Sequence, residues 1–341
     1  MRHAWALLLV CLASCNSPNA SVSVPPAPSP RFMFGIDLQY MGACIASTDA
    51  GCRKLSMAQE AGATWVRILL PWDQVEPDAP AGGVHSYHFD SYLDGVIAAA
   101  NAAGLRVLLG LYHAPSWANG NPYGNWICDP SYACVACPDG EYHQGAPPDP
   151  VALQAFAQAV AEHTAGKVAY FGVWNEPNLA CNFQPRTADY MGEYLEAIAL
   201  PISRGVRAAG SGNVVVGPEV ALSACGIPSG CSGLDQWITA NRFVSVFDIL
   251  SVHAYRGSHG DVAADLDAVH LAAPGAAVWL TESGFSANQA SEVRGLYVDN
   301  YNRSGWWART FYHGLIGNGA TDLLNLDWSA RPGFAAFRDA Y

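Results

Sequence analysis

The chain has 341 residues, of which 51% are hydrophobic and 13% are charged. A charged fraction near half of the usual roughly 25% excludes a disordered or fibrous chain and indicates one large folded core. Acidic side chains outnumber basic ones by 29 to 17, giving a net charge of −12, and no run of Lys or Arg occurs. The sequence therefore offers no basic surface for nucleic acid or for another acidic polymer.

The N-terminus has the pattern of an export signal. Arg2 precedes a short apolar stretch at 4–12, too short to cross a bilayer, and small residues follow it. The string LASC at 12–15 resembles the lipobox of bacterial lipoproteins, which implies cleavage after residue 14 and a lipid on Cys15; an ordinary signal peptide is the alternative. Residues 15–30 are rich in Pro and Ser and predict a tether. We expect an envelope-anchored protein, preferably at the outer membrane, or a secreted one, with its folded domain at 31–341.

Ten cysteines in an exported chain predict disulfides. Setting aside Cys11 in the signal and Cys15 leaves eight. Two pairs are close enough in sequence to close single loops: Cys44 with Cys52, and Cys225 with Cys231. The remaining four allow three pairings, which the sequence leaves open: Cys128, Cys134, Cys137 and Cys181. The two-residue spacing between Cys134 and Cys137 also fits a zinc knuckle, but no matching second pair accompanies it.

Eight short apolar or aromatic runs recur along the chain, each followed by a segment of helical periodicity. They occupy 32–38, 64–70, 106–112, 168–174, 213–220, 247–253, 277–282 and 321–328. Such runs predict a parallel sheet buried on both faces. We therefore expect an α/β fold, a single (β/α)₈ barrel with a Cys-rich loop at 113–150 after the third strand. An open doubly wound sheet is the alternative, although no Gly-x-Gly-x-x-Gly loop follows the first strand.

Two glutamates end predicted strands that face each other across such a barrel. Glu176 lies in the string VWNEPN at 173–178, after the fourth strand, and Glu282 lies in VWLTESG at 278–284, in the seventh. Barrel enzymes carry their active sites at these carboxyl ends. Two carboxylates flanking one bond are what glycoside cleavage requires: one protonates the leaving oxygen, and the other attacks the sugar or activates water.

These strings, with APSWA at 114–118, resemble a retaining glycoside hydrolase of clan A. The region from 148 to 178 is similar to family 39, and the TESG string resembles family 5 at least as well. The resemblance implies that Glu176 is the acid/base, that Glu282 is the nucleophile, and that Asn175 hydrogen-bonds the 2-hydroxyl of the sugar. It implies cleavage of a β-linked polysaccharide or oligosaccharide by double displacement.

Other polar residues near strand ends are candidates for substrate binding or support. Arg67 is a charge in an apolar strand and must be paired, and we expect it to hold Glu282 ionised. His253 and Tyr255 share one side of the sixth strand, and the clan resemblance places the tyrosine hydroxyl on the nucleophile. His113, ending the third strand, is either a sugar contact or a packing residue. Trp328 would end the eighth strand and form a floor under the sugar.

We expect a neutral carbohydrate as the only small-molecule partner, no metal or organic cofactor, contact with a membrane only through the lipid, and a monomer. A transglycosylase would use the same two glutamates with a sugar in place of water. A non-catalytic carbohydrate-binding lipoprotein is the alternative outside enzymology, but such a protein has no need of two carboxylates facing one bond.

Overall fold

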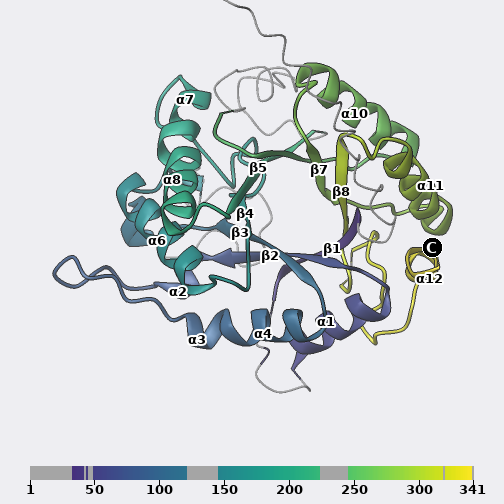
Figure 1. Ribbon diagram of the computed structural model, residues 1–341, viewed down its shortest axis with the longest axis horizontal. Helices are drawn as coiled ribbons and strands as arrows, with labels where there is room; N and C mark the ends of the chain where they lie inside the picture. Colours follow the sequence, from purple (N-terminus) through teal and green to yellow (C-terminus); the bar gives the residue numbers. More distant parts are fainter. Residues whose placement is uncertain are drawn as a thin grey trace, which may run out of the picture.

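A computed structural model describes residues 33–41, 44, 49–120, 145–222, 245–317 and 319–339. Eight parallel strands close into a barrel in chain order, so the predicted (β/α)₈ architecture is confirmed (Figure 1). The strands are β1 (Phe34–Tyr40), β2 (Trp65–Pro71), β3 (Arg106–Tyr112), β4 (Tyr170–Val173), β5 (Val214–Ala221), β6 (Ile249–His253), β7 (Val278–Ser283) and β8 (Trp307–His313).

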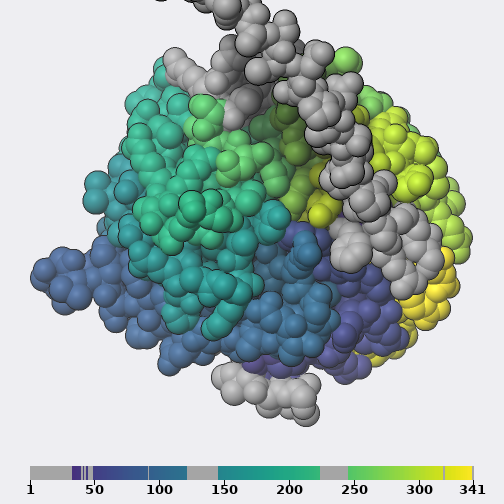
Figure 2. All heavy atoms as spheres, in the orientation of Figure 1, coloured from purple at the N-terminus to yellow at the C-terminus, as the bar shows by residue number. Residues whose placement is uncertain are grey.

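Helices surround the barrel and cover its outer surface (Figure 1). They are α1 (Ala50–Glu60), α2 (Trp72–Val75), α3 (Phe89–Tyr92), α4 (Asp94–Ala102), α5 (Ser116–Asn119), α6 (Pro150–His163), α7 (Tyr190–Tyr194), the π-helical turn η3 (Leu195–Ala199), α8 (Leu200–Ala209), α10 (His259–Ala272), α11 (Gln289–Asn302) and α12 (Pro332–Arg338). Between α2 and α3 the chain projects as a narrow arm, on the left of Figures 1 and 2. None of the described helices is long and apolar enough to cross a membrane.

Local sequence explains where these helices begin and which face they bury. In α6 the Asp149 carboxylate accepts hydrogen bonds from the amides of Val151 and Ala152, and Pro150 occupies the first turn. Both features satisfy or remove amide groups that a helix start leaves without partners. Leu153, Phe156 and Val160 recur on one face of α6 and are buried, and α6 packs against α8.

Seven of the eight predicted runs overlap observed strands, but the eighth does not. The eighth strand is Trp307–His313, and the predicted run at 321–328 makes only isolated bridges, from Leu324 to Ile316 and to Ala330. The run resembled a strand because it contains the apolar pair Leu323 and Leu324, which are fully buried although they lie outside the barrel strands. The true strand, β8, begins soon after the end of α11 and carries Arg309 and partly exposed positions. Its sequence therefore lacks the continuous apolar pattern of the other strands.

The amino-terminal half of the barrel interior is filled by aromatic and aliphatic side chains. Trp65 of β2 packs edge-on against Trp279 of β7 and Phe311 of β8, in a cluster with Leu108 and Val216. Since side chains of a strand alternate between its faces, Arg67 points into the same interior as Trp65, one layer nearer the carboxyl ends. Arg67 therefore belongs to a charged layer, and the apolar cluster fills the barrel on the amino-terminal side of that layer.

The predicted disulfide between Cys44 and Cys52 is present, with a Cα–Cα distance of 4.8 Å, and it ties the chain after β1 to α1. Cys181 is also disulfide-bonded. The remaining predictions on cysteines and termini lie outside the described residues. They concern Cys15 with the signal and tether, the Cys225 and Cys231 pair, most of the loop at 113–150, and Cys128, Cys134 and Cys137.

Candidate active site

The strands depart from regular geometry at the carboxyl end of the barrel. Register shifts occur between Asp37 and Gln39 in β1, between Pro218 and Val220 in β5, and between Leu280 and Ser283 in β7. Such bulges break the alternation of side chains and redirect a residue, which is why they are common beside active sites. Glu219, at the centre of the β5 shift, has a φ of 56°. The bulges in β1, β5 and β7 accompany Asp37, Glu219 and Glu282, whose carboxylates all meet Arg67.

Arg67 is the centre of this charged layer and is completely buried. Its Nη1 donates to Glu282 Oε1 at 2.7 Å and to Asp37 Oδ1 at 3.0 Å. Its Nε and Nη2 donate to the two carboxylate oxygens of Glu219 at 3.3 and 2.5 Å, and Nη2 also donates to Asn175 Oδ1 at 2.7 Å. The predicted pairing of Arg67 with Glu282 is present. The guanidinium fixes the position of the nucleophile candidate and of the asparagine in one network.

Hydrogen bonds to the backbone hold the segment 173–178 in place. The buried Trp174 indole donates to the carbonyl of Asn182 at 2.7 Å. Asn178 exchanges two hydrogen bonds with the backbone of Ala221, at 2.8 and 2.9 Å, which ties the segment to the end of β5. The Glu176 amide donates to the carbonyl of Glu219 at 3.0 Å, and Glu176 has a φ of 42°. These hydrogen bonds hold Glu176 in a backbone conformation that glutamate rarely adopts.

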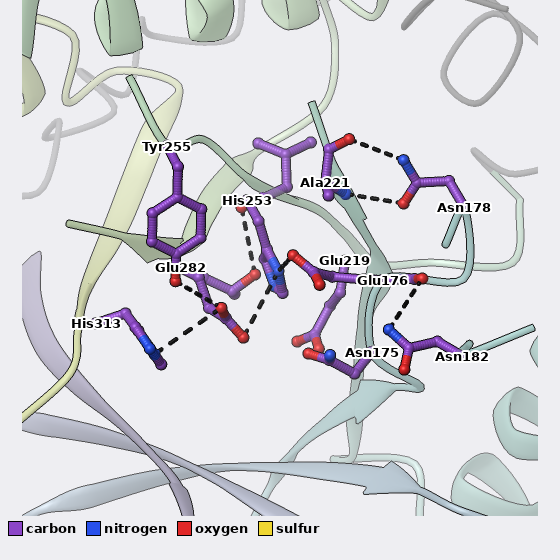
Figure 3. A network of polar contacts seen from close by, with 12 residues as sticks. Asn175, Glu176, Asn178, Asn182, Glu219, Ala221, His253, Tyr255, Glu282 and His313 are labelled. Atoms are coloured by element: carbon purple, nitrogen blue, oxygen red, sulfur yellow. Dashed lines mark hydrogen bonds and ion pairs between the residues drawn. The ribbon is translucent and has the colours of Figure 1, made fainter. Parts of the chain in front are cut away.

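Glu176 and Glu282 meet at the mouth of the barrel with His253 between them (Figure 3). His253 Nδ1 lies 3.0 Å from Glu176 Oε1 and 3.6 Å from Glu282 Oε1. One carboxylate oxygen of Glu176 lies within 4.8 Å of one of Glu282. Glycosidases that act with retention keep their carboxyl groups about 5 to 5.5 Å apart, against about 6.5 to 9.5 Å for inversion. The close approach of these two oxygens favours the retaining arrangement.

Glu282 is held in its ionised form. Burial alone would raise its pKa, but the positive charges of His253, Arg67 and His313 and a hydrogen bond from Tyr255 outweigh burial and lower the pKa to about 2. The Tyr255 hydroxyl donates to Glu282 Oε2 at 2.8 Å. Burial and the neighbouring carboxylate of Glu282 raise the pKa of Tyr255 well above its ordinary value, so the phenol keeps its proton. The contact between this tyrosine and Glu282, expected from the resemblance, is present.

His313 occupies the end of the true eighth strand. Its Nδ1 lies 2.7 Å from Asp37 Oδ2 and 3.9 Å from Glu282 Oε2. Burial would lower its pKa, but the hydrogen bond to Asp37 and the charges of Glu282 and Asp37 raise the pKa to about 9. The imidazole is therefore protonated at neutral pH and adds its positive charge to that of Arg67 beside the carboxylates.

His313 should make the stability of the fold depend on pH. A histidine whose folded pKa is raised from 6.5 to about 9 stabilises fully below pH 6.5, and this contribution is lost as the pH rises through 9. The difference corresponds to about 3 kcal/mol at most. In urea unfolding at pH 6 and at pH 9.5, we expect the stability gap between wild type and His313→Gln to shrink toward the higher pH. Equal gaps at both pH values would contradict the assignment.

The structure also places the four remaining predicted residues. Asn175 and His253 join the network around the glutamates, as described above. His113 ends β3, where its Nδ1 lies 3.5 Å from Asp73 Oδ2, and it is buried. The placement of Trp328 at the end of the eighth strand was wrong, because that run is not a strand. Its indole lies instead under the guanidinium of Arg53, at 4.1 Å from the ring centroid.

Three residues of the site were missed: Asp37, Glu219 and His313. Asp37 and Glu219 are acids inside apolar predicted strands, so the argument applied to Arg67, that a buried charge needs a partner, would have found both. His313 lay outside every predicted strand.

The described residues contain two groups whose ligand atoms lie close enough to hold a metal ion: Asp37, Glu282 and His313, and Glu176, His253 and Glu282. In both groups the Glu282 oxygens already accept from Arg67 and Tyr255. The guanidinium beside them would also repel a cation. The geometry favours carboxylate chemistry over metal binding.

A closed barrel of alternating strands and helices with two carboxylates at its mouth has the arrangement that glycoside hydrolysis requires. Residues 34–315 match the model of the cellulase family (glycosyl hydrolase family 5), and the chain belongs to that family.

Solved structures of related fold come from family 39 and from a family 5 enzyme. A family 39 glycoside hydrolase from Bacteroides cellulosilyticus WH2 has 18% identity and a TM-score of 0.61, with 92% of this chain and 64% of that chain covered. A monomeric beta-xylosidase from Caulobacter crescentus CB15 has 16% identity and a TM-score of 0.67, with 92% and 68% covered. XacCel5A, solved in complex with cellopentaose, has 14% identity and a TM-score of 0.62, with 92% and 100% covered. The chain thus spans about two thirds of the length of the first two. The sequence has no significant match among curated proteins.

Proposed function

We propose that this protein hydrolyses β-linked polysaccharide or oligosaccharide with retention of anomeric configuration, with Glu282 as nucleophile and Glu176 as acid/base. The approach of the two carboxylates to within 4.8 Å carries the proposal, because an inverting enzyme needs room for a water molecule between them. Family membership supports the same class of reaction.

In the first step a Glu282 oxygen attacks the anomeric carbon, the bond to the glycosidic oxygen breaks, and the Glu176 proton passes to that oxygen. The leaving group departs as an alcohol, and the sugar remains esterified to Glu282. In the second step Glu176 takes a proton from water, the water oxygen attacks the anomeric carbon, and the Glu282 carboxylate leaves.

The charges of the network support this division of roles. Two cations, Arg67 and His313, face three carboxylates, Asp37, Glu219 and Glu282. Glu176 instead meets His253, whose Nδ1 lies 3.0 Å from its Oε1, and its side chain is 17% exposed against 4% for Glu282. It is thus the carboxyl best placed to carry a proton to the leaving oxygen. Asn175, held by Arg67, carries the amide donors that would meet the 2-hydroxyl of the sugar.

A panel of aryl β-glycosides and β-glycans tests the reaction, with NMR used to determine the anomer formed first. A 2-deoxy-2-fluoro glycoside should trap a covalent adduct on the peptide that contains Glu282. An inverted product, or cleavage with the adduct on another residue, would contradict the mechanism. Product analysis with an added acceptor sugar separates hydrolysis from transglycosylation.

A further inference from the structure

A cavity of about 370 Å³ opens at the amino-terminal end of the barrel, where β3 and β4 begin. This end is opposite the mouth that holds the two glutamates. The volume of the cavity lies within the range of small-molecule sites, roughly 300 to 1,000 Å³. None of the described residues that line it is acidic, and its polar side chains are those of Asn101, Arg106, Lys167 and Tyr170. The cavity is therefore cationic, on a chain whose net charge is −12.

Two matching turns bring the cations to the edge of this cavity. Gly104 follows α4 with a φ of 72°, two residues before Arg106, and Gly166 follows α6 with a φ of 76°, directly before Lys167. Glycine adopts this conformation without strain, so each turn can end a helix and lead into the next strand. The Lys167 amide also donates to the carbonyl of Thr164 at 2.9 Å. The backbones that carry the two cations are thus fixed before any ligand binds.

The positive charges at this end have no acidic partner among the described residues. Arg106 and Lys167 are exposed and form no ion pair there. The guanidinium carbons of Arg106 and Arg309 lie 5.6 and 5.2 Å from the centroid of the same Trp65 ring. Burial and the charge of Arg106 lower the pKa of Arg309, more than offsetting the opposing effect of Tyr170. Arg309 Nε is also a buried donor without an acceptor in the described part of the chain. An anion would relieve this repulsion.

The donors around the cavity suit a phosphate group. The guanidinium of Arg106 can donate to two oxygens at once, and Lys167 adds a compact positive charge. The Tyr170 hydroxyl and the Asn101 amide are neutral donors. The Tyr170 ring is held in place by stacking on Trp279, with 5.3 Å between centroids. A phosphate has enough oxygens to accept from several of these donors together, whereas a carboxylate has two.

The position of the cavity indicates a source for such a phosphate. The chain enters the barrel at the amino-terminal end of β1, so the tether expected at 15–30 joins the barrel at the end where the cavity lies. A lipid on Cys15 would place this end nearest the membrane, where anionic headgroups attract basic residues. The catalytic mouth would then face away from the membrane and stay open to a polysaccharide.

We propose that this cavity binds a phosphate group, and that Arg106 and Lys167 hold the headgroup phosphate of an anionic lipid there. A soluble phosphate compound is the other source of the same chemistry, and the experiment separates the two. The proposal does not depend on glycoside cleavage, because it concerns the opposite end of the barrel and is tested by binding alone.

The test measures sedimentation of the protein with vesicles of phosphatidylglycerol or of phosphatidylcholine at low ionic strength. Cys15→Ser removes the expected lipid attachment site in every sample. Binding should be tighter to phosphatidylglycerol. Arg106→Gln and Lys167→Gln should each weaken it roughly 5-fold, as expected for one basic residue near an anionic surface. Arg256→Gln, at an exposed arginine after β6 at the other end of the barrel, makes the same change in net charge and should leave binding unchanged.

Calorimetry with glycerol phosphate separates the two sources. Vesicle binding that Arg106→Gln and Lys167→Gln both weaken supports the headgroup assignment. Binding of glycerol phosphate without binding of vesicles, lost in Lys167→Gln, would support the phosphate site and overturn the lipid source. Binding of neither probe, or an equal loss with Arg256→Gln and Lys167→Gln, would overturn the proposal as a whole.

Discussion

Glu282→Gln should lower kcat/KM on an aryl β-glycoside by roughly 10⁴-fold or more, because the amide cannot form the covalent intermediate. The substitution is nearly isosteric, but Arg67 Nη1 and the Tyr255 hydroxyl donate to different oxygens of Glu282, so the single carbonyl oxygen of Gln can keep only one of these two hydrogen bonds. Glu196→Gln, at an exposed glutamate of η3, is the matched control and should retain full activity.

Glu176→Gln should give a different kinetic pattern. General acid catalysis contributes roughly 10² to 10⁴-fold, and a strongly acidic phenol departs without it. The loss in kcat/KM should therefore be large for a poor leaving group and small for a dinitrophenol, and azide should restore turnover as a nucleophile that needs no base. If Glu176→Gln and Glu282→Gln behave identically across leaving groups, the assignment of two distinct roles is wrong.

Arg67→Met should have the largest effect on stability. It removes the common partner of three buried carboxylates, at distances of 3.0, 2.5 and 2.7 Å. Removing one member of a buried ion pair costs about 3 to 5 kcal/mol, because the remaining charge is left in the interior. Arg207→Met, which breaks an exposed pair with Asp248 and hydrogen bonds to Ser203 Oγ and the Val246 carbonyl, should cost less, about 1 to 2 kcal/mol. Both are measured by urea unfolding at neutral pH.

Arg67→Lys separates the charge from the geometry if Arg67→Met fails to fold. A lysine keeps one positive charge but cannot serve Glu219, Glu282 and Asn175 with a fixed planar group. We expect a smaller loss of stability than for Arg67→Met, together with a large loss of kcat/KM. Stability and activity equal to the wild type would show that charge alone accounts for the role of Arg67.

The barrel could be predicted because its signal is repetitive and local. Seven apolar runs separated by helical segments have few other solutions, so one misplaced strand did not change the fold. The position of Glu176 and Glu282 followed from their place at strand ends. The identity of β8 could not be predicted, since Arg309 interrupts its apolar pattern and the buried pair Leu323 and Leu324 offered a better one.

The arrangement inside the mouth was less predictable because it depends on bulges. A strict alternation along β5 does not say which way Glu219 points once the register shifts between Pro218 and Val220. The pairing of Arg67 with Glu282 was expected, whereas its contacts with Asp37 and Glu219 require the three-dimensional course of β1 and β5. Only the closed barrel brings these chain-distant groups to one guanidinium.

Substitutions intended to raise thermostability should leave the register shift in β5 unchanged. Residues held at positive φ cost roughly 1 to 3 kcal/mol each, so a redesign toward ideal geometry would flag Glu219, at 56°, as an obvious site for improvement. Yet a regular strand geometry there would move both carboxylate oxygens of Glu219 away from Arg67. The guanidinium could then shift, and Glu282 would shift with it. Sturdier variants are better sought in the outer helices, where a gain in rigidity leaves the charged layer undisturbed.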